Sequence, residues 1–153
     1  MNEESQVEEN IITAETALPN SLKPEELTTI KNVAKTYRKL FKVPCTGCQY
    51  CMPCINSINI PGNFQIFNQY HIDKAEQKAR GMYAMMLMGG LNGKRADAAL
   101  CKDCKQCIQR CPQHIDIPEE LKAVAKELGG AKTEAVLAMM KAHMAPKTTK
   151  KAE

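Results

Sequence analysis

The sequence predicts a mainly α fold built around two short cysteine-rich loops. The chain has 153 residues with eight Cys, no Trp, three Phe and four Tyr, so it cannot build a large aromatic core. Ala, Leu, Ile and Met must therefore fill the interior, and these residues suit packed helices. The segments around the cysteines carry apolar residues at helical spacing and are bounded by Pro and Gly. A length of 153 residues fits one compact domain with an appendage.

Residues 1–43 are expected to be an N-terminal helical extension. In residues 24–43 the apolar residues recur on one helix face: Leu27, Ile30, Ala34, Tyr37 and Phe41. Pro24 and the Glu25–Glu26 pair favour a helix start, and Pro44 favours its end. The segment is therefore predicted to be one amphipathic linker helix.

Residues 44–128 are expected to be the main domain, and residues 129–153 a final helix with a basic, disordered tail. Between the cysteine runs we predict helices over 68–88 and 94–100, separated by Gly89, Gly90 and Gly93. A further helix is predicted over 118–128, where Gly129 and Gly130 end it. The last helix is predicted over 133–144, and residues 146–153 are expected to fray.

The eight cysteines form two runs with almost the same spacing. The runs are Cys45-x2-Cys48-x2-Cys51-x2-Cys54 and Cys101-x2-Cys104-x2-Cys107-x3-Cys111, the latter followed by Pro112. The second run has the spacing by which thiolates bind [4Fe–4S] clusters, with the fourth cysteine ligating the other cluster in two-cluster ferredoxins. Zinc sites more often join two C-x2-4-C hooks across a longer stretch. The pattern therefore favours iron–sulfur over zinc, and zinc over disulfides.

The sequence after each cysteine run is also repeated. Cys54, Ile58, Ile60, Pro61 and Phe64 reappear 57 residues later as Cys111, Ile115, Ile117, Pro118 and Leu121. The first three cysteines of each run are 56 residues apart, so one residue has been added before Cys111. The two runs therefore look like halves of a duplicated unit with two adjacent clusters.

A duplicated unit with exchanged fourth ligands assigns the cysteines to two [4Fe–4S] clusters. Cluster 1 takes Cys45, Cys48, Cys51 and Cys111, and cluster 2 takes Cys101, Cys104, Cys107 and Cys54. Ile55 stands where the pattern has Pro, and the gap before Cys54 is one residue shorter. Local ligation, in which Cys54 and Cys111 each complete their own run, therefore stays open.

These segments resemble the C-terminal iron–sulfur domain of ferredoxin-bearing aldo/keto reductases of anaerobic prokaryotes. The resemblance is carried by PCTGCQYCMPC (44–54), IPGNFQIFN (60–68) and the block from Cys101 to Leu121. Residues 7–30 are similar to the end of an aldo/keto reductase barrel, where a Glu-Asn pair opens the last barrel helix. Glu9 and Asn10 match that pair, which implies a place near the adenine end of NADP(H) if a barrel is supplied. The barrel and its catalytic tetrad are not in this chain, so no catalytic residue is predicted.

The leading hypothesis is thus a two-cluster electron-transfer domain that works with an aldo/keto reductase barrel or another redox protein and with an external electron carrier. The alternatives are a zinc-stabilised interaction module without a redox role, and a complete carbonyl reductase, against which the missing tetrad argues. The net charge of +4 is better explained as a counterweight to cluster charge than as a nucleic-acid surface. With no predicted signal peptide or membrane span, we expect a cytoplasmic protein without membrane partners.

Overall fold

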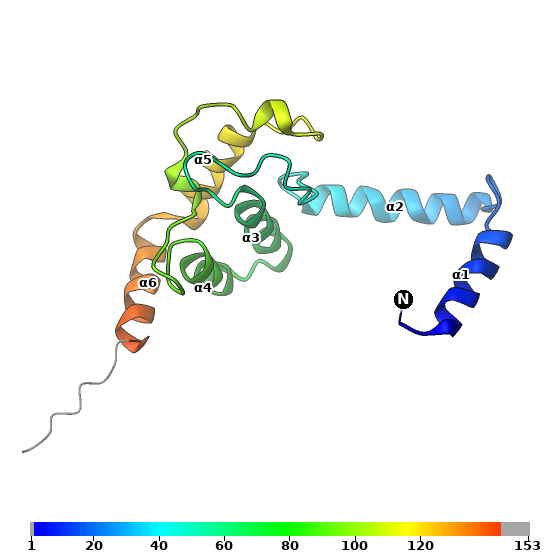
Figure 1. The fold of residues 1–153 in the computed structure, drawn as a ribbon, viewed down its shortest axis with the longest axis horizontal. Coiled ribbons are helices and arrows are strands. Elements are labelled where there is room, and N and C mark those ends of the chain that lie inside the picture. The colour runs from blue at the N-terminus through cyan, green and yellow to red at the C-terminus, as the bar shows by residue number, and fades with distance from the viewer. Residues whose placement is uncertain (1, 145–153) are drawn as a thin grey trace, which may run out of the picture. The chain divides into compact units, whose positions relative to one another are not determined.

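A computed structural model describes residues 2–144, and these are helical with no strand among them (Figure 1). The predicted mainly α fold class is therefore confirmed. The chain divides into two compact units, residues 1–37 and residues 38–153. The predicted frayed tail, 146–153, lies outside the described residues. No helix of the described residues is long and apolar enough to cross a membrane.

The first unit contains α1 (Glu4–Thr16) and most of α2 (Pro24–Leu40). α2 begins at Pro24 as predicted but ends three residues earlier than expected. Its start is stabilised because the Glu26 carboxylate accepts a hydrogen bond from the Lys23 backbone N–H (2.7 Å). None of the residues 2–37 is buried, so the apolar stripe of α2 lies on the surface of the described chain.

The prediction of one helix over 68–88 is wrong, because two helices cover this region. α3 runs from Ile60 to Asp73 and α4 from Glu76 to Met86. α3 begins early because the Asn59 side chain accepts a hydrogen bond from the Gly62 N–H (3.0 Å), with Pro61 in the first turn. The helix ends at Asp73 because the next residue, Lys74, has a left-handed φ of 53° and cannot continue a helix.

The predicted helix over 94–100 is also wrong, since only the three-residue 3-10 turn η1 (Ala98–Leu100) forms there. The buried Asp97 carboxylate accepts two hydrogen bonds from the Arg95 guanidinium (2.7 and 2.8 Å) and one from the Ala99 N–H (3.3 Å). Such local side-chain bonds compete with the helical backbone pattern. A second turn, η2 (Ile108–Arg110), lies within the second cysteine run.

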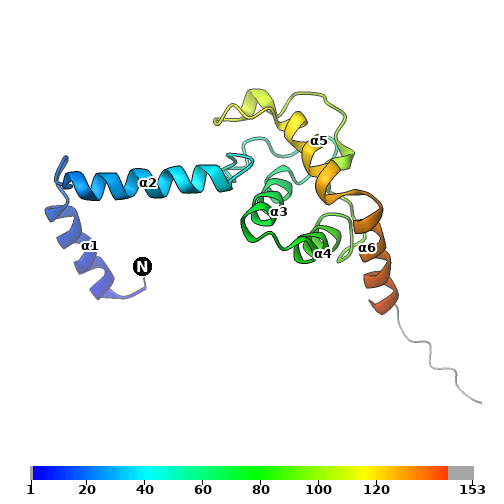
Figure 2. The same ribbon diagram turned by 180° about the vertical axis from the view of Figure 1, so that it is seen from behind.

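Two further helices complete the domain, α5 (Ile117–Leu128) and α6 (Gly130–Met144). α3 packs on α4 and α5, and α6 packs on α4 and α5 (Figure 2). Arg80 on α4 strengthens this packing because it donates a hydrogen bond to the Thr133 hydroxyl (2.9 Å) of α6. The core between the helices includes Phe64, Tyr83 and Leu121, each 1% exposed.

Two buried carboxamides on α3 hold the backbone that leads into each cysteine run. The Asn68 amide accepts hydrogen bonds from the N–H groups of Lys42 and Val43 (3.0 and 2.9 Å) and donates to the Val43 carbonyl (2.8 Å). These bonds position the approach to Cys45, since the buried Val43 N–H has no strand or helix to pair with.

The second carboxamide, Asn63, holds the backbone that leads into the second cysteine run. Its amide donates to the Ala96 carbonyl (2.9 Å), and its oxygen accepts from the Tyr83 hydroxyl (3.0 Å). That hydroxyl in turn accepts a hydrogen bond from the Ala98 N–H (3.0 Å). One helix therefore positions both segments from which the cysteine loops depart.

We predict that Asn68→Ala lowers the free energy of unfolding by about 3 kcal/mol, since it leaves the buried Val43 N–H unpaired and removes one of the two hydrogen bonds to the Val43 carbonyl. Urea denaturation under anaerobic conditions measures this change. Gln65→Ala, which removes an exposed amide from the same helix, is the matched control and should cost less than about 0.5 kcal/mol. Equal effects of the two substitutions would contradict the role given to Asn68.

Candidate metal centre

The two cysteine loops share a pattern of left-handed residues. Three pairs of residues at the repeat spacing adopt left-handed φ values: Gly47 and Asp103 (71° and 53°), Gln49 and Lys105 (66° and 60°), and Ser57 and His114 (60° and 52°). Non-glycine residues seldom adopt the left-handed region of backbone space. Its occurrence at matching positions of both loops therefore indicates that the loops are related. The repeat read from the sequence is thus also a structural repeat.

The turns and the helices that follow them repeat as well. The Met52 N–H donates to the Gln49 carbonyl (2.9 Å), and the Ile108 N–H donates to the Lys105 carbonyl (3.1 Å). Beyond the loops, Asn59 caps α3 and Asp116 caps α5, each by a side chain that accepts a backbone N–H. Each half is therefore a cysteine loop followed by a capped helix, and the two helices pack together.

The first candidate site is a hollow where cysteines from both runs meet. Four thiols line it: Cys45, Cys48, Cys51 and Cys111. Its other walls include the apolar side chains of Ile60, Phe64, Ile115 and Ile117. Three thiols thus come from the first loop and the fourth from the second, inside a largely apolar surround.

The second hollow reverses this arrangement. Its lining includes Cys104 and Cys107 of the second run together with Cys54 of the first. Cys101 interacts electrostatically with Cys107, so it belongs to the same group of thiols. Ile55 and Arg110 also line this hollow. Cys54 therefore lies beside the cysteines of the other run.

Cys51 lines both hollows, which are consequently adjacent. Its side chain is 8% exposed and belongs to the hydrophobic core. Cys51 also interacts electrostatically with Cys107, its counterpart in the repeat. The two hollows thus share a buried wall at Cys51.

Burial and the neighbouring thiols change the acidity of these side chains. The pKa of Cys107 is raised from the ordinary 9.0 to about 11, mainly by burial and to a smaller extent by the thiols of Cys104, Cys101 and Cys51. Burial likewise raises the pKa values of Cys45 and Cys51, although the Gly47 backbone N–H bonded to the Cys45 sulfur opposes the shift. Grouped thiolates in these hollows are therefore unfavourable until a cation neutralises them.

The donor set fits clusters of iron and sulfide better than single ions. Among residues 2–144, no three His, Cys, Asp or Glu side chains are close enough to hold one metal ion. A [4Fe–4S] cluster is larger than one ion and takes four thiolates, which is the number that the first hollow brings together. The apolar walls and the Gly47 N–H supply the dry surround and the hydrogen bond to sulfur that tune such clusters.

A comparison with protein families agrees with this geometry. Residues 44–115 match the family model described as a 4Fe-4S dicluster domain. This match supports a ferredoxin-type domain over these residues. A search of the curated proteins and of the solved structures found no match to the chain. The matched segment, here called the dicluster domain, contains all eight cysteines. Its cysteine pattern fits two clusters and indicates iron–sulfur electron transfer.

The two remaining predicted site residues, Glu9 and Asn10, belong to α1. Both are exposed, and they lie in the middle of this helix rather than at its start. Conversely, sequence reasoning missed Asn63 and Asn68, which position the two loops of the dicluster domain. The available signal was that the two Asn residues of α3 each stand next to a Phe in the sequence.

The raised thiol pKa values predict a pH dependence of the cluster-free dicluster domain. Because Cys107 keeps its proton to higher pH when folded than when unfolded, the folded state binds more protons between about pH 9 and 11. The raised pKa of Cys107 therefore stabilises the folded state below pH 9, and this contribution is lost as the pH rises towards 11. Thermal unfolding followed by circular dichroism should show a falling midpoint across this window.

Cys107→Ser is the control for this effect, because it removes the titrating group and should reduce the decline. Cluster-loaded protein should also lack this decline, since its thiolates are already deprotonated and bound to iron. A midpoint that does not change between pH 9 and 11 in the cluster-free protein would contradict the assigned shift.

Proposed function

We propose that this chain relays single electrons through two [4Fe–4S] clusters between an external electron carrier and an aldo/keto reductase barrel. The observation that carries the proposal is the grouping of Cys45, Cys48 and Cys51 with Cys111 in one hollow. The match of residues 44–115 to a 4Fe-4S dicluster domain supports the same chemistry.

The proposed ligands follow the exchange of fourth cysteines between the halves. Cys45, Cys48, Cys51 and Cys111 hold cluster 1, while Cys101, Cys104, Cys107 and Cys54 hold cluster 2. The place of Cys54 beside Cys104 and Cys107 supports this set over local ligation.

When bound, each cluster takes up and releases one electron. The chain contributes the thiolates that bind iron and the apolar walls that exclude water. It also contributes the Gly47 N–H, which donates to the Cys45 sulfur. Cys51, which borders both hollows, is proposed to lie on the path between the clusters.

The barrel enters the proposal through the N-terminal unit. The resemblance of residues 7–30 to the end of an aldo/keto reductase barrel suggests where this domain joins or meets its partner. In that case Glu9 and Asn10 would contribute to NADP(H) binding on the barrel. The exposed apolar residues of this unit, such as Ile11 and Ile30, each 53% exposed, are consistent with a face that a partner covers.

Metal analysis of anaerobically purified protein tests the cofactor. We expect about eight irons and eight sulfides per chain, the content of two [4Fe–4S] clusters. The brown protein should bleach on reduction and recover on oxidation. About two zincs per chain with no sulfide would instead support a structural zinc module.

Pairs of cysteine substitutions test the ligand exchange. If Cys54 and Cys101 hold the same cluster, Cys54→Ala/Cys101→Ala damages one cluster and leaves about four irons per chain. The matched pair Cys54→Ala/Cys45→Ala damages both clusters and leaves far less iron. Iron content and the electron paramagnetic resonance signal of the reduced protein measure the outcome. The reverse order of the two pairs would show local ligation.

A further inference from the structure

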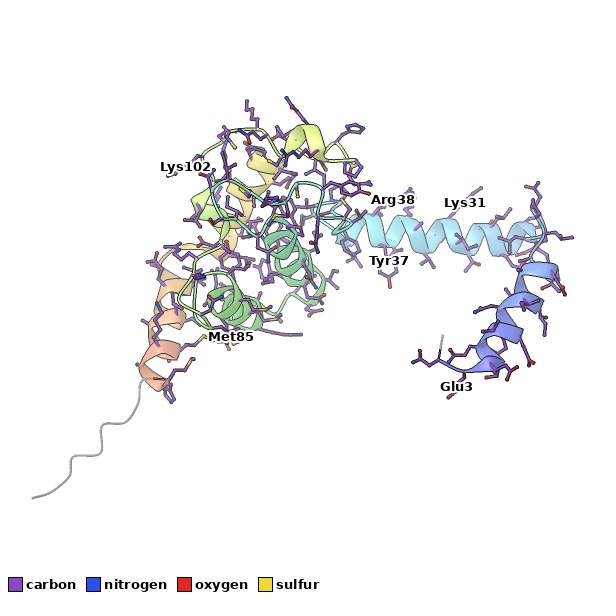
Figure 3. All side chains as sticks on the ribbon, viewed as in Figure 1. Glu3, Lys31, Tyr37, Arg38, Met85 and Lys102 are labelled. Atoms are coloured by element: carbon purple, nitrogen blue, oxygen red, sulfur yellow. The ribbon has the colours of Figure 1, made fainter. Side chains whose placement is uncertain are left out.

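The two halves of the dicluster domain differ sharply in charge. Residues 43–72, which include the whole first cysteine run, contain no Lys, Arg, Asp or Glu. The second run carries Lys102, Lys105 and Arg110, and all three side chains are exposed. Figure 3 shows Lys102 at the edge of the domain, directed away from the helical core. The duplicated loops thus share their left-handed turns but not their surface charge.

Holding a cluster does not require these basic residues. Under the proposed function each half binds a cluster of the same charge, and the first loop contains no positive side chain to balance it. The second loop has one carboxylate, Asp103, which lies 3.5 Å from Lys122. In the described part of the chain, Lys102, Lys105 and Arg110 have no carboxylate partner. Their charge is therefore available to another molecule.

An apolar side chain lies next to this charge. Ile55 is 66% exposed and borders the same hollow as Cys54, Cys104 and Arg110. Arg110 is also adjacent to the extra residue position that distinguishes the second run from the first. An exposed apolar residue beside basic side chains is the surface composition of a protein-docking site, in which apolar contact adds affinity and charge adds orientation.

We propose that Lys102, Lys105, Arg110 and Ile55, here called the basic face, dock an acidic one-electron carrier protein. Exposure alone does not distinguish the two loops as docking sites, because Cys48 in the first loop and Cys104 in the second are both exposed. Charge distinguishes them, since the basic second loop attracts an acidic carrier and raises its association rate. Weak electron-transfer interfaces are small, so a few side chains suffice. The inference rests on the proposed function and specifies where the external carrier binds.

The repeat itself supplies well-matched variants. Thr46 and Gln49 occupy in the first loop the places of Lys102 and Lys105 in the second, and Gln49 has the same left-handed backbone as Lys105. Lys102→Thr/Lys105→Gln therefore removes two charges with residues that this loop conformation already accommodates. The stronger variant is Lys102→Glu/Lys105→Glu/Arg110→Glu. Its control is Lys94→Glu/Lys126→Glu/Lys141→Glu, which makes the same change in net charge at exposed positions outside the loop.

The experiment measures binding of the oxidised, cluster-loaded protein to an acidic [2Fe–2S] ferredoxin by calorimetry at about 20 and 200 mM salt. At low salt, the triple variant of the basic face should bind about tenfold or more weakly, and the neutral double variant about threefold more weakly. The control triple should stay within about twofold of the wild type. Raising the salt should weaken binding of the wild type and not of the triple variant.

Electron transfer gives a second readout. The rate with the acidic ferredoxin should fall in the order of binding, while the rate with an uncharged small mediator should be unchanged in every variant. Equal binding by the basic-face and control triples, or no binding by the wild type, overturns the docking proposal. Failure of the mediator to reduce the wild-type clusters would instead overturn the proposed electron-transfer function. Should the triple variant lose iron, the neutral double variant decides the question.

Discussion

Two buried carboxamides on α3, Asn63 and Asn68, position both cysteine loops by hydrogen bonds to the backbone that leads into them. Loops of this kind have no regular partner for their N–H and carbonyl groups, and an unpaired buried group is costly. The Tyr83 hydroxyl extends the network to the Ala98 N–H, close to Cys101. A single helix therefore sets where the two groups of thiols lie relative to each other.

The duplication explains why the thiols meet across the runs. Each half is a cysteine loop with left-handed residues at three matching positions, followed by a capped helix. The two helices, α3 and α5, pack on each other. This pairing brings Cys111 to the first loop and Cys54 to the second. Once the helices have paired, each group of thiols gains one thiol from the neighbouring half, as the proposed ligand exchange requires. The two halves differ at the surface, where the first loop is neutral and the second is basic.

The sequence was sufficient to predict those features that metal-binding chemistry or internal repetition constrains. The cysteine spacing, the 57-residue repeat and the helix starting at Pro24 could all be read directly. Helix boundaries between the runs could not, because they depend on Lys74 adopting a left-handed backbone and on Asp97 binding Arg95. The roles of Asn63 and Asn68 depend on contacts with residues 25 to 33 positions away, which local patterns do not reveal.

We propose that two [4Fe–4S] clusters occupy the adjacent hollows that share Cys51. Electron paramagnetic resonance of the fully reduced protein tests it most directly, because two neighbouring reduced clusters interact magnetically. We expect a broadened, spin-coupled spectrum at full reduction and a simple spectrum when only one cluster is reduced. A spectrum that grows on reduction without any sign of coupling, or no iron signal at all, would contradict the account.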